Sequence, residues 1–285
     1  IGNEMDTGLP PAYYDRETDE QQPDYLDKGL PTEEVTVAEV LKKKGYHTVH
    51  IGKWHMSPAL PSPGTYGINH VGALHGPTPH DGIQNVGAHQ TSKVWMGRDT
   101  STFDAAIAWL RHTAIPPFYL NVWARTPHEP IPYKPGHGMN RSALLAPFAS
   151  MRVDERRFGP GMRAKFNATR RACANASDGC DAEATIRRGM SDYLGEVYGL
   201  DFQVGRLLRV LDEGGVAETT LVLFTSDHGP EARLASSPPR VPRDFGSVGP
   251  HHGGKHSTVE GGVNVPLVVR WPGRVPKGTT SDYVT

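Results

Sequence analysis

Three segments of this chain repeat one order of elements: an amphipathic helix, a turn, and a short apolar strand. The run VAEVLKKKGY, with Gly45 near its end, precedes the alternating run HTVHI. The run TFDAAIAWLRHT precedes PPFYLNVWA, and helical spacing over 190–211 stops at Gly214 and Gly215 before TTLVLFT. The apolar residues expected on the inward helix faces are Val37, Val40, Leu41, Phe103, Ile107, Leu110, Met190, Tyr193, Leu194, Val197, Leu200, Val204, Leu207, Leu208 and Leu211.

Repeated alternation of helix and strand predicts an α/β fold with a largely parallel sheet and helices on both faces. A fourth strand, VPLVVRW at 265–271, follows a loop rich in Gly and His rather than a helix, which predicts a mixed sheet. The segments 56–100 and 127–186 are expected to be long loops, and loops of that length are usually functional. No internal repeat and no separate second domain is expected.

Charge and hydropathy exclude several classes of partner. The 30 Lys and Arg residues nearly balance the 31 Asp and Glu residues, so the net charge does not predict a nucleic-acid or membrane partner. No apolar run approaches the roughly 18 residues of a membrane span, and the N-terminal run lacks the pattern of a signal peptide. Because the overall charge is balanced, a small anion would have to be bound by a local cluster of basic side chains.

The cysteines and sequons bear on the compartment. Cys173 and Cys180 lie close together in a polar segment, a spacing that suits a local disulfide in an oxidising compartment, although two free thiols fit nearly as well. Three Asn-x-Ser/Thr triplets are acceptors for glycosylation in a secreted protein. Together these features favour the secretory pathway, with a lysosomal or extracellular destination. The three triplets begin at Asn140, Asn167 and Asn175.

A polar motif follows each expected strand or precedes the last one. Because the carboxyl ends of parallel strands meet at one edge of a sheet, these motifs are expected to converge on one pocket. Two lysines and two histidines suit an anionic tetrahedral group, while a carboxylate prefers a hard divalent cation. The residues are Lys53 and His55 in IGKWH, His128 in ARTPHEP, Asp227 and His228 in FTSDHGP, and Lys255 in GGKHSTVEGG.

Each of these residues also has an ordinary structural interpretation. The run from Asp227 to Pro230 has the composition of a turn, the lysines fit solvated surface charges, and the histidines fit hydrogen-bonded loop residues. His228 is compatible with ligating a cation and with hydrogen bonding to the anion. The presence of such motifs at four strand ends favours a functional site.

The same motifs resemble the landmarks of a known family. GYHTVHIGKWHMS is similar to a sulfatase signature, and TPHEP, FTSDHGP and GGKHSTVEGGVNVPLVVRWPG resemble later landmarks in the same order, over roughly 36–275. The nearest resemblance is to the arylsulfatase and galactosamine-6-sulfatase branch. It implies an alkaline-phosphatase-like α/β fold, a calcium ion, and hydrolysis of sulfate esters by a formylglycine made from cysteine.

The resemblance also implies roles for the motif residues. Asp227 and His228 match the second half of the calcium site. Lys53, His55, His128 and Lys255 match the residues that bind sulfate. Among these, His128, Lys255 and His55 are the candidates for catalysis, and whether His128 or Lys255 protonates the departing alcohol stays open.

Two departures from the family pattern matter. The motif Cys-x-Pro/Ala-x-Arg is absent, because Cys173 is followed by ANAS and Cys180 by DAEA, and the paired aspartates that open the metal site are absent too. Residues 1–285 are therefore expected to be a partial sulfatase catalytic domain, without its N-terminal nucleophile segment and C-terminal part, and catalytically incomplete. A smaller departure is Asn264, where relatives often carry Arg, which puts a local salt bridge in doubt.

The leading hypothesis is a calcium-dependent sulfatase that acts on an aryl or carbohydrate sulfate. The alternatives are a phosphate or phosphonate ester hydrolase of the same superfamily and a non-catalytic protein that binds sulfated ligands. The long loops are expected to set specificity, and Trp95 or Tyr133 is suited to stacking on a sugar or to packing. The sequence leaves the substrate and the oligomeric state open.

Overall fold

The computed structural model describes residues 29–57, 60–75, 96–128, 141–177, 179–231, 245–255 and 257–282. Trp95, Tyr133 and Asn140 lie outside these ranges. The chain divides into two compact units. We name them by their sheets: the two-stranded unit comprises Ile1–Tyr13, Met151–Met190 and Leu208–Thr285, and the three-stranded unit comprises Tyr14–Ser150 and Ser191–Leu207.

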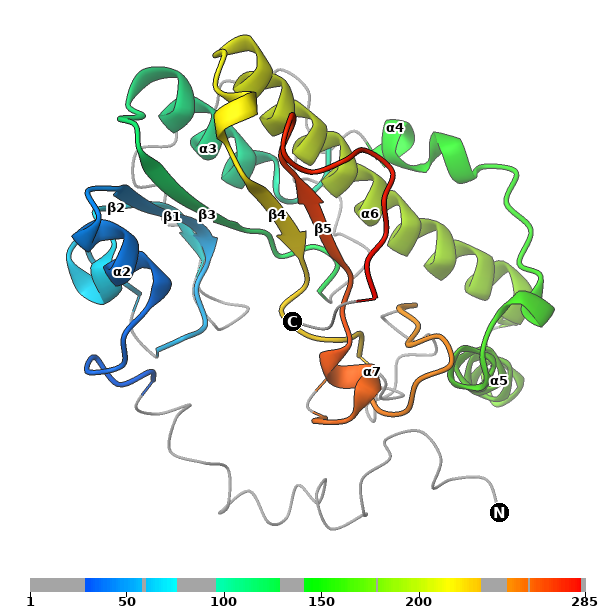
Figure 1. Ribbon diagram of the computed structural model, residues 1–285. Helices are drawn as coiled ribbons and strands as arrows, with labels where there is room; N and C mark the ends of the chain where they lie inside the picture. Colours follow the sequence, from blue (N-terminus) through cyan, green and yellow to red (C-terminus); the bar gives the residue numbers. More distant parts are fainter. Residues whose placement is uncertain are drawn as a thin grey trace. The chain divides into compact units, whose positions relative to one another are not determined.

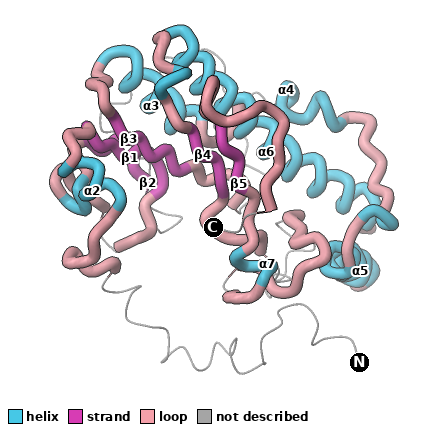
Figure 2. Tube along the Cα trace, in the orientation of Figure 1, coloured by secondary structure: helices cyan, strands magenta, loops and turns pink. Residues whose placement is uncertain are grey.

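The three-stranded unit is built on a parallel sheet with the strand order β2-β1-β3 (Figures 1 and 2). In the register of the sheet, Val49 of β1 pairs with His70 of β2 and with Leu120 of β3. The predicted helix and strand pairs are confirmed here. The elements are α2 (Val37–Lys43), β1 (His47–Lys53), η3 (Thr65–Gly67), β2 (His70–His75), α3 (Thr100–His112), β3 (Phe118–Trp123), α4 (Arg141–Leu145), η4 (Ala146–Phe148) and the middle of α6 (Ala182–Glu213).

Alternating side chains of this sheet pack into two cores, one on each face. Val49 and Ile51 of β1 pack with Ala106 and Trp109 of α3, and Leu207 of α6 packs against the same cluster. On the opposite face Trp54 packs in a second cluster whose other buried members are Ala38, Tyr66, Ile68 and Val71. Because side chains of a strand alternate between its faces, β3 contributes to both cores: Leu120 and Val122 pack against the first cluster, and Tyr119 and Trp123 pack against the second.

The inward face predicted for the first helix is wrong. Val37 is 62% exposed and Val40 is also exposed, while Ala38 is buried. Helix α2 has only seven residues and is fixed at its first turn, where Thr36 and Glu39 form a capping box. The Thr36 hydroxyl also donates to the carbonyl of Tyr66 (2.9 Å). This bond fixes the start of the helix against η3, and the face that carries Ala38 is the buried one.

The two-stranded unit contains an antiparallel pair, β4 and β5, in which Val222 pairs with Arg270 and Thr225 with Leu267. This pair confirms that the strands of the chain are mixed in direction. The expectation that the run before Asp227 is a buried strand is wrong, because Leu223 of β4 is 60% exposed. Strand β4 pairs along one edge only in the described part of the chain. The elements are η5 (Glu155–Arg157), α5 (Pro160–Ala174), the two ends of α6, η6 (Ala217–Thr219), β4 (Val222–Thr225), α7 (Glu260–Val263) and β5 (Leu267–Arg270).

Both segments expected to be long loops contain regular structure. Strand β2 lies within 56–100, and helices α4 and α5 lie within 127–186. The third helix also begins earlier than predicted, at Ala182, where Asp181 caps its N-terminus by accepting from the amide of Ala184. Helix α5 carries several basic residues, Arg163, Lys165, Arg170 and Arg171, so its apolar period is weak in the sequence.

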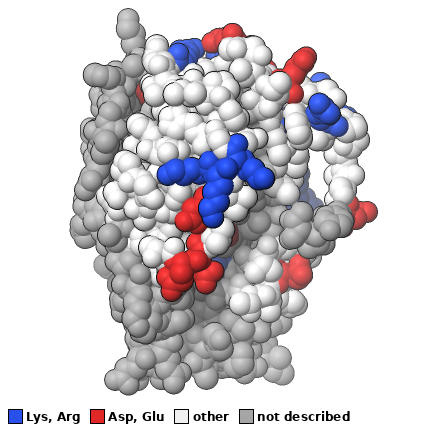
Figure 3. Space-filling model, turned by 60° about the vertical axis from the view of Figure 1, so that its left-hand side comes forward, with Lys and Arg blue, Asp and Glu red and all other residues white. Residues whose placement is uncertain are grey.

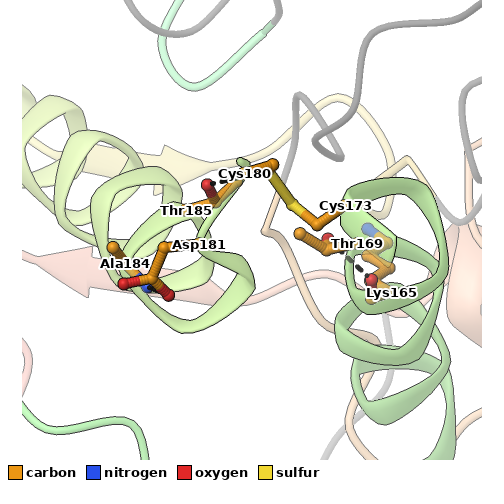
Figure 4. The surroundings of a disulfide bond; sticks show 7 residues. All are labelled: Lys165, Thr169, Cys173, Cys180, Asp181, Ala184 and Thr185. Carbon is orange, nitrogen blue, oxygen red and sulfur yellow. Dashed lines mark hydrogen bonds between the residues drawn. A yellow bond between two sulfur atoms is a disulfide. The ribbon is translucent and has the colours of Figure 1, made fainter. Parts of the chain in front are cut away.

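Helices α5 and α6 are joined by a disulfide between Cys173 and Cys180 (Figure 4). The bond confirms the local pairing expected from the spacing and excludes two free thiols in this structure. Arg170 of α5 also bonds the carboxylates of Glu155 and Glu183, the latter at 2.8 Å. The covalent bond and these ion pairs hold the two helices side by side.

The surface around α2 carries charges of both signs. Lys42, Lys43 and Lys44 are exposed at the end of this helix, and Glu33 and Glu34 are exposed before its start. Figure 3 shows a group of basic side chains directly beside acidic ones on this side of the molecule. Among the described helices, none is both long enough and apolar enough to cross a membrane.

Candidate functional site

Lys53 and His55 follow an irregularity at the end of β1. The pairing with β2 shifts between Ile51 and Lys53, and Gly52 between them has a φ of 108°. A Cβ atom at Gly52 would lie 2.2 Å from the carbonyl oxygen of Trp123, so this position needs glycine. The shift leaves Lys53 half-buried at the carboxyl end of the strand and His55 exposed beyond it.

His50, within β1, holds the backbone at the end of the same strand. Its ring lies between Trp54 and Trp123, with centroid distances of 5.0 Å and 4.7 Å. Its Nε2 atom donates to the carbonyl of Lys53 (3.0 Å), because a carbonyl can only accept. Burial lowers the pKa of His50 to about 4. A neutral, buried imidazole therefore ties down the backbone of Lys53.

His128 follows β3 in a loop held from two sides. The carboxylate of Asp99 accepts from the backbone amides of Arg125 (2.8 Å) and Thr126 (2.9 Å). The guanidinium of Arg98 donates to the carbonyl of His128 (2.6 Å) and lies 3.5 Å from Glu196. The loop is thus fixed through its backbone at three of its residues.

Lys53, His55 and His128 follow strands that end at the same edge of the parallel sheet. Strands β1 and β3 are neighbours and run in the same direction, with Gly52 paired to Trp123 at their carboxyl ends. Lys53 and His55 follow the first of these residues directly, and His128 lies five residues after the second. The structure therefore places three of the predicted site residues at the same sheet edge.

Asp227 and His228 lie in the loop after β4. Asp227 is 71% exposed, and its Oδ2 atom lies 3.4 Å from Nε2 of His228. The Nδ1 atom of His228 donates to the carbonyl of Gly229 (2.8 Å), so in the neutral ring Nε2 carries the lone pair. An imidazole nitrogen and a carboxylate oxygen then face the same space.

Lys255 is held beside this loop by backbone hydrogen bonds. Its amide donates to the carbonyl of Pro230 (2.9 Å), and the amide of Gly229 donates to the carbonyl of Gly262 (2.8 Å). A Cβ atom at Gly229 would lie 1.8 Å from the carbonyl oxygen of Gly261, so the two segments approach as closely as their glycines allow. The Asp227, His228 and Lys255 segments therefore form one continuous loop cluster in the two-stranded unit.

The pair Asp227 and His228 fits part of a cation site. Two lone-pair atoms at 3.4 Å repel one another unless a cation or a proton lies between them, and a carboxylate oxygen is a ligand that hard cations prefer. The described residues contain no group of three or more His, Cys, Asp or Glu side chains placed to hold a metal ion. The pair therefore fits as two ligands of a larger set.

The six predicted site residues divide between the two units. Lys53, His55 and His128 belong to the three-stranded unit, and the others belong to the two-stranded unit. Their convergence on a single pocket stays a prediction, as do their individual roles.

Sequence reasoning missed three residues that bind the His128 loop: Arg98, Asp99 and Glu196. Asp99 precedes α3 and resembles an ordinary N-cap, yet its side chain makes no capping bond to its own helix. Glu196 is 3% exposed within the long helix α6, whose apolar residues drew the prediction. A carboxylate at an inward-facing position of a helix indicates that it pairs with a cation or a hydrogen-bond donor on another segment. The sequence does not identify that partner.

Comparison with known proteins decides the family. The model of the sulfatase family matches residues 3–285 of this chain. The chain belongs to the sulfatase family. It is 29% identical to the arylsulfatase of Hemicentrotus pulcherrimus over 265 residues, which cover 90% of this chain and 41% of that protein.

Two further relatives lie in the branch that the motifs predicted. Arylsulfatase A of Homo sapiens is 31% identical over 263 residues, covering 90% of this sulfatase chain and 46% of that protein. N-acetylgalactosamine-6-sulfatase of Canis lupus familiaris is 41% identical over 100 residues, covering 35% and 18% of the two chains. The chain thus spans less than half the length of these relatives.

A solved structure supports the fold. A protein in complex with its substrate D-glucosamine-2-N,6-O-disulfate aligns with a TM-score of 0.53 and 19% identity, covering 86% of this chain and 57% of that one. The alkaline-phosphatase-like α/β fold, with a largely parallel mixed sheet and helices on both faces, is confirmed.

Proposed function

We propose that the full-length protein hydrolyses sulfate esters. The observation that supports this proposal is that Lys53, His55 and His128 follow two neighbouring parallel strands, β1 and β3, in a chain of the sulfatase family. Cationic and imidazole side chains at such strand ends suit a tetrahedral anion with a leaving oxygen. Lys255 is proposed to join them from the loop cluster of the two-stranded unit.

Each residue has a proposed task in this reaction. Lys53 and Lys255 neutralise charge on the sulfate oxygens, and His55 donates a hydrogen bond to one of them. His128 or Lys255 gives a proton to the departing alcohol oxygen. By family resemblance the nucleophile is a formylglycine, which residues 1–285 do not contain.

Asp227 and His228 are proposed to hold a calcium ion. The lone pair on Nε2 of His228 and the carboxylate of Asp227 face one another at 3.4 Å, a geometry that a shared cation relieves. When bound, a divalent cation polarises the oxygens of the ester. The remaining ligands of this ion would come from outside the described residues.

A carbohydrate sulfate is the proposed substrate class. The proposal is supported by the structural neighbour solved with a disulfated glucosamine and by the segment shared with N-acetylgalactosamine-6-sulfatase. An aryl sulfate serves as a simpler test compound of the same ester class.

The secretory pathway is the proposed route, with a lysosomal or extracellular destination. The disulfide between Cys173 and Cys180 needs an oxidising compartment. Asn167 and Asn175 are exposed within Asn-x-Ser/Thr triplets on either side of Cys173, so both are proposed glycosylation sites. Enzymatic removal of N-glycans from the secreted protein should lower its mass, and the Asn→Gln variants should abolish that change.

Release of sulfate tests the proposed function. Full-length protein from a cell that forms formylglycine is given 4-methylumbelliferyl sulfate, 6-O-sulfated glucosamine and the matching phosphate esters. We expect sulfate release, and a fall in kcat/KM of at least about 100-fold in His128→Ala. Lys43→Ala, on the exposed end of α2, is the control and should match the wild type.

Two results contradict the proposal. Faster hydrolysis of the phosphate esters would assign the protein to another ester class. Tight binding of the sulfated sugar without turnover would make it a binding protein.

A further inference from the structure

We propose that Asp99, together with Arg98 and Glu196, positions the loop that carries His128, so that the three residues set the place of its imidazole. None of them was predicted as a site residue, and none is assigned a role in the reaction above. The inference rests on the proposed function of His128. Its structural part, the fixing of residues 125–128, is testable without any substrate.

Asp99 is the centre of this arrangement. It is 2% exposed and directly precedes α3, but its side chain makes no capping hydrogen bond to that helix. Oδ1 accepts from the amide of Arg125 at 2.8 Å and Oδ2 accepts from the amide of Thr126 at 2.9 Å. A buried carboxylate needs such donors, and bonds from amides to an ionised group are stronger than neutral ones. The start of α3 is thereby tied to the first turn after β3.

The far end of the loop is held by an ion pair. Arg98 donates from Nη1 to the carbonyl of His128 at 2.6 Å, while its Nε lies 3.5 Å from Oε2 of Glu196. The hydroxyl of Thr126 lies 3.5 Å from the same carboxylate oxygen. Glu196 is buried within α6, so it holds Arg98 in one orientation, and Arg98 in turn holds the backbone of His128.

These contacts are made to the backbone of the loop, at the amides of Arg125 and Thr126 and the carbonyl of His128. Two successive amides and a carbonyl are fixed by the side chains of Asp99 and Arg98, which lie just before α3. A shift of about 1 Å in a catalytic group lowers a rate by about 100-fold, so a loosened loop should cost turnover before it costs folding. This makes Asp99, Arg98 and Glu196 positioning residues.

The chain offers a matched control on the same helix. Asp104 of α3 is also buried, at 3% exposed, and accepts from Nη2 of Arg206 in α6 at 2.7 Å. Within the described part of the chain, Asp104 bonds Arg206 and makes no hydrogen bond to residues 125–128. Asp99→Asn and Asp104→Asn therefore remove the same charge from two buried sites, only one of which reaches the loop.

The experiment compares these two variants in the full-length enzyme. We expect Asp99→Asn to lower kcat at least about tenfold with little change in KM, because Nδ2 of Asn opposes one of the two amides. Amide hydrogen exchange at Arg125, Thr126 and His128 should accelerate in this variant. Asp104→Asn should lose comparable stability and keep both kcat and the exchange rates of the loop.

Equal kcat and equal exchange at 125–128 in the two variants would overturn the proposal and leave Asp99 a purely structural residue. If Asp99→Asn does not fold, Glu196→Gln replaces it, since it removes the charge that orients Arg98. If the wild-type enzyme releases no sulfate, the proposed function fails, and the exchange rates alone still decide whether Asp99 fixes the loop.

Discussion

At the scale of single residues, His50 shows how burial sets the chemistry of a side chain. The residue is fully buried between two tryptophans, and its Nδ1 atom has no hydrogen-bond partner among the described residues. The sequence places it in an alternating strand, HTVHI, with no sign that it differs from His47. Protonation would put an unpaired charge into this apolar space.

The stability of the protein should therefore decrease in acid through His50. Its pKa in the folded protein is about 4, below the ordinary value of 6.5, so the unfolded chain binds the proton first as the pH falls. The contribution is complete above pH 6.5 and is lost as the pH falls toward 4, by about 3 kcal/mol in the free energy of unfolding.

Urea unfolding at several values between pH 7 and pH 4 measures this effect. His50→Gln keeps a donor for the Lys53 carbonyl and cannot titrate, so its free energy of unfolding should depend less on pH over this range. His112→Gln, at the exposed end of α3, should retain the wild-type dependence. Parallel curves for the wild type and His50→Gln would show that another group dominates.

At the scale of elements, α6 contains two glycines with opposite structural demands. Gly205 is exposed, and a Cβ atom there would meet no atom within 4 Å. A Cβ atom at Gly199 would lie 3.0 Å from Cδ2 of Leu144 and 3.2 Å from Cα of Gly97. The first glycine weakens the helix, whereas the second permits the close approach of the segment before α3.

We expect Gly205→Ala to raise the free energy of unfolding by about 0.5 to 1 kcal/mol, because alanine loses less backbone entropy on folding. Gly199→Ala should lower it by about 1 to 3 kcal/mol, because the added methyl group overpacks a tight contact. Denaturant unfolding of the two variants measures both changes. A gain in stability at both positions would show that the contact around Gly199 adjusts freely.

At this scale, the sequence predicted the helices and strands whose apolar residues recur with a clear period. Helix α3 and strands β1 and β3 have strong apolar periods and were found, whereas α5 and β2 have weak ones and were expected to be loops. The burial of β4 was wrongly predicted. An apolar run shows that a strand is suited to burial, but whether its side chains are buried depends on which other elements pack against it.

At the scale of the whole molecule, the proposed calcium ion should stabilise the full-length protein. A ligand present at 100 times its Kd adds about 2.7 kcal/mol to the free energy of unfolding. We expect a chelator to lower the Tm and added calcium to restore it. Scanning calorimetry of the secreted protein, with and without chelator, measures the shift.

Two variants of the two-stranded unit make this test specific. Asp227→Ala should have a lowered Tm that no longer responds to chelator. Asp212→Asn, whose side chain pairs with Arg270 at 2.8 Å, should keep the full response. A wild-type Tm that is insensitive to chelator would remove the support for a calcium site at Asp227 and His228.

The sequence by itself determined the family, the three pairs of helix and strand with strong apolar periods, and the motif residues that follow the strands, because local periodicity and short motifs are properties of neighbouring residues. Tertiary structure alone decided that Gly52 brings Lys53 to the sheet edge, that His50 stays neutral, and that Asp99 holds the His128 loop. These features arise where segments distant in sequence approach within a few ångströms. Burial and partner choice are set there, and no local pattern records them.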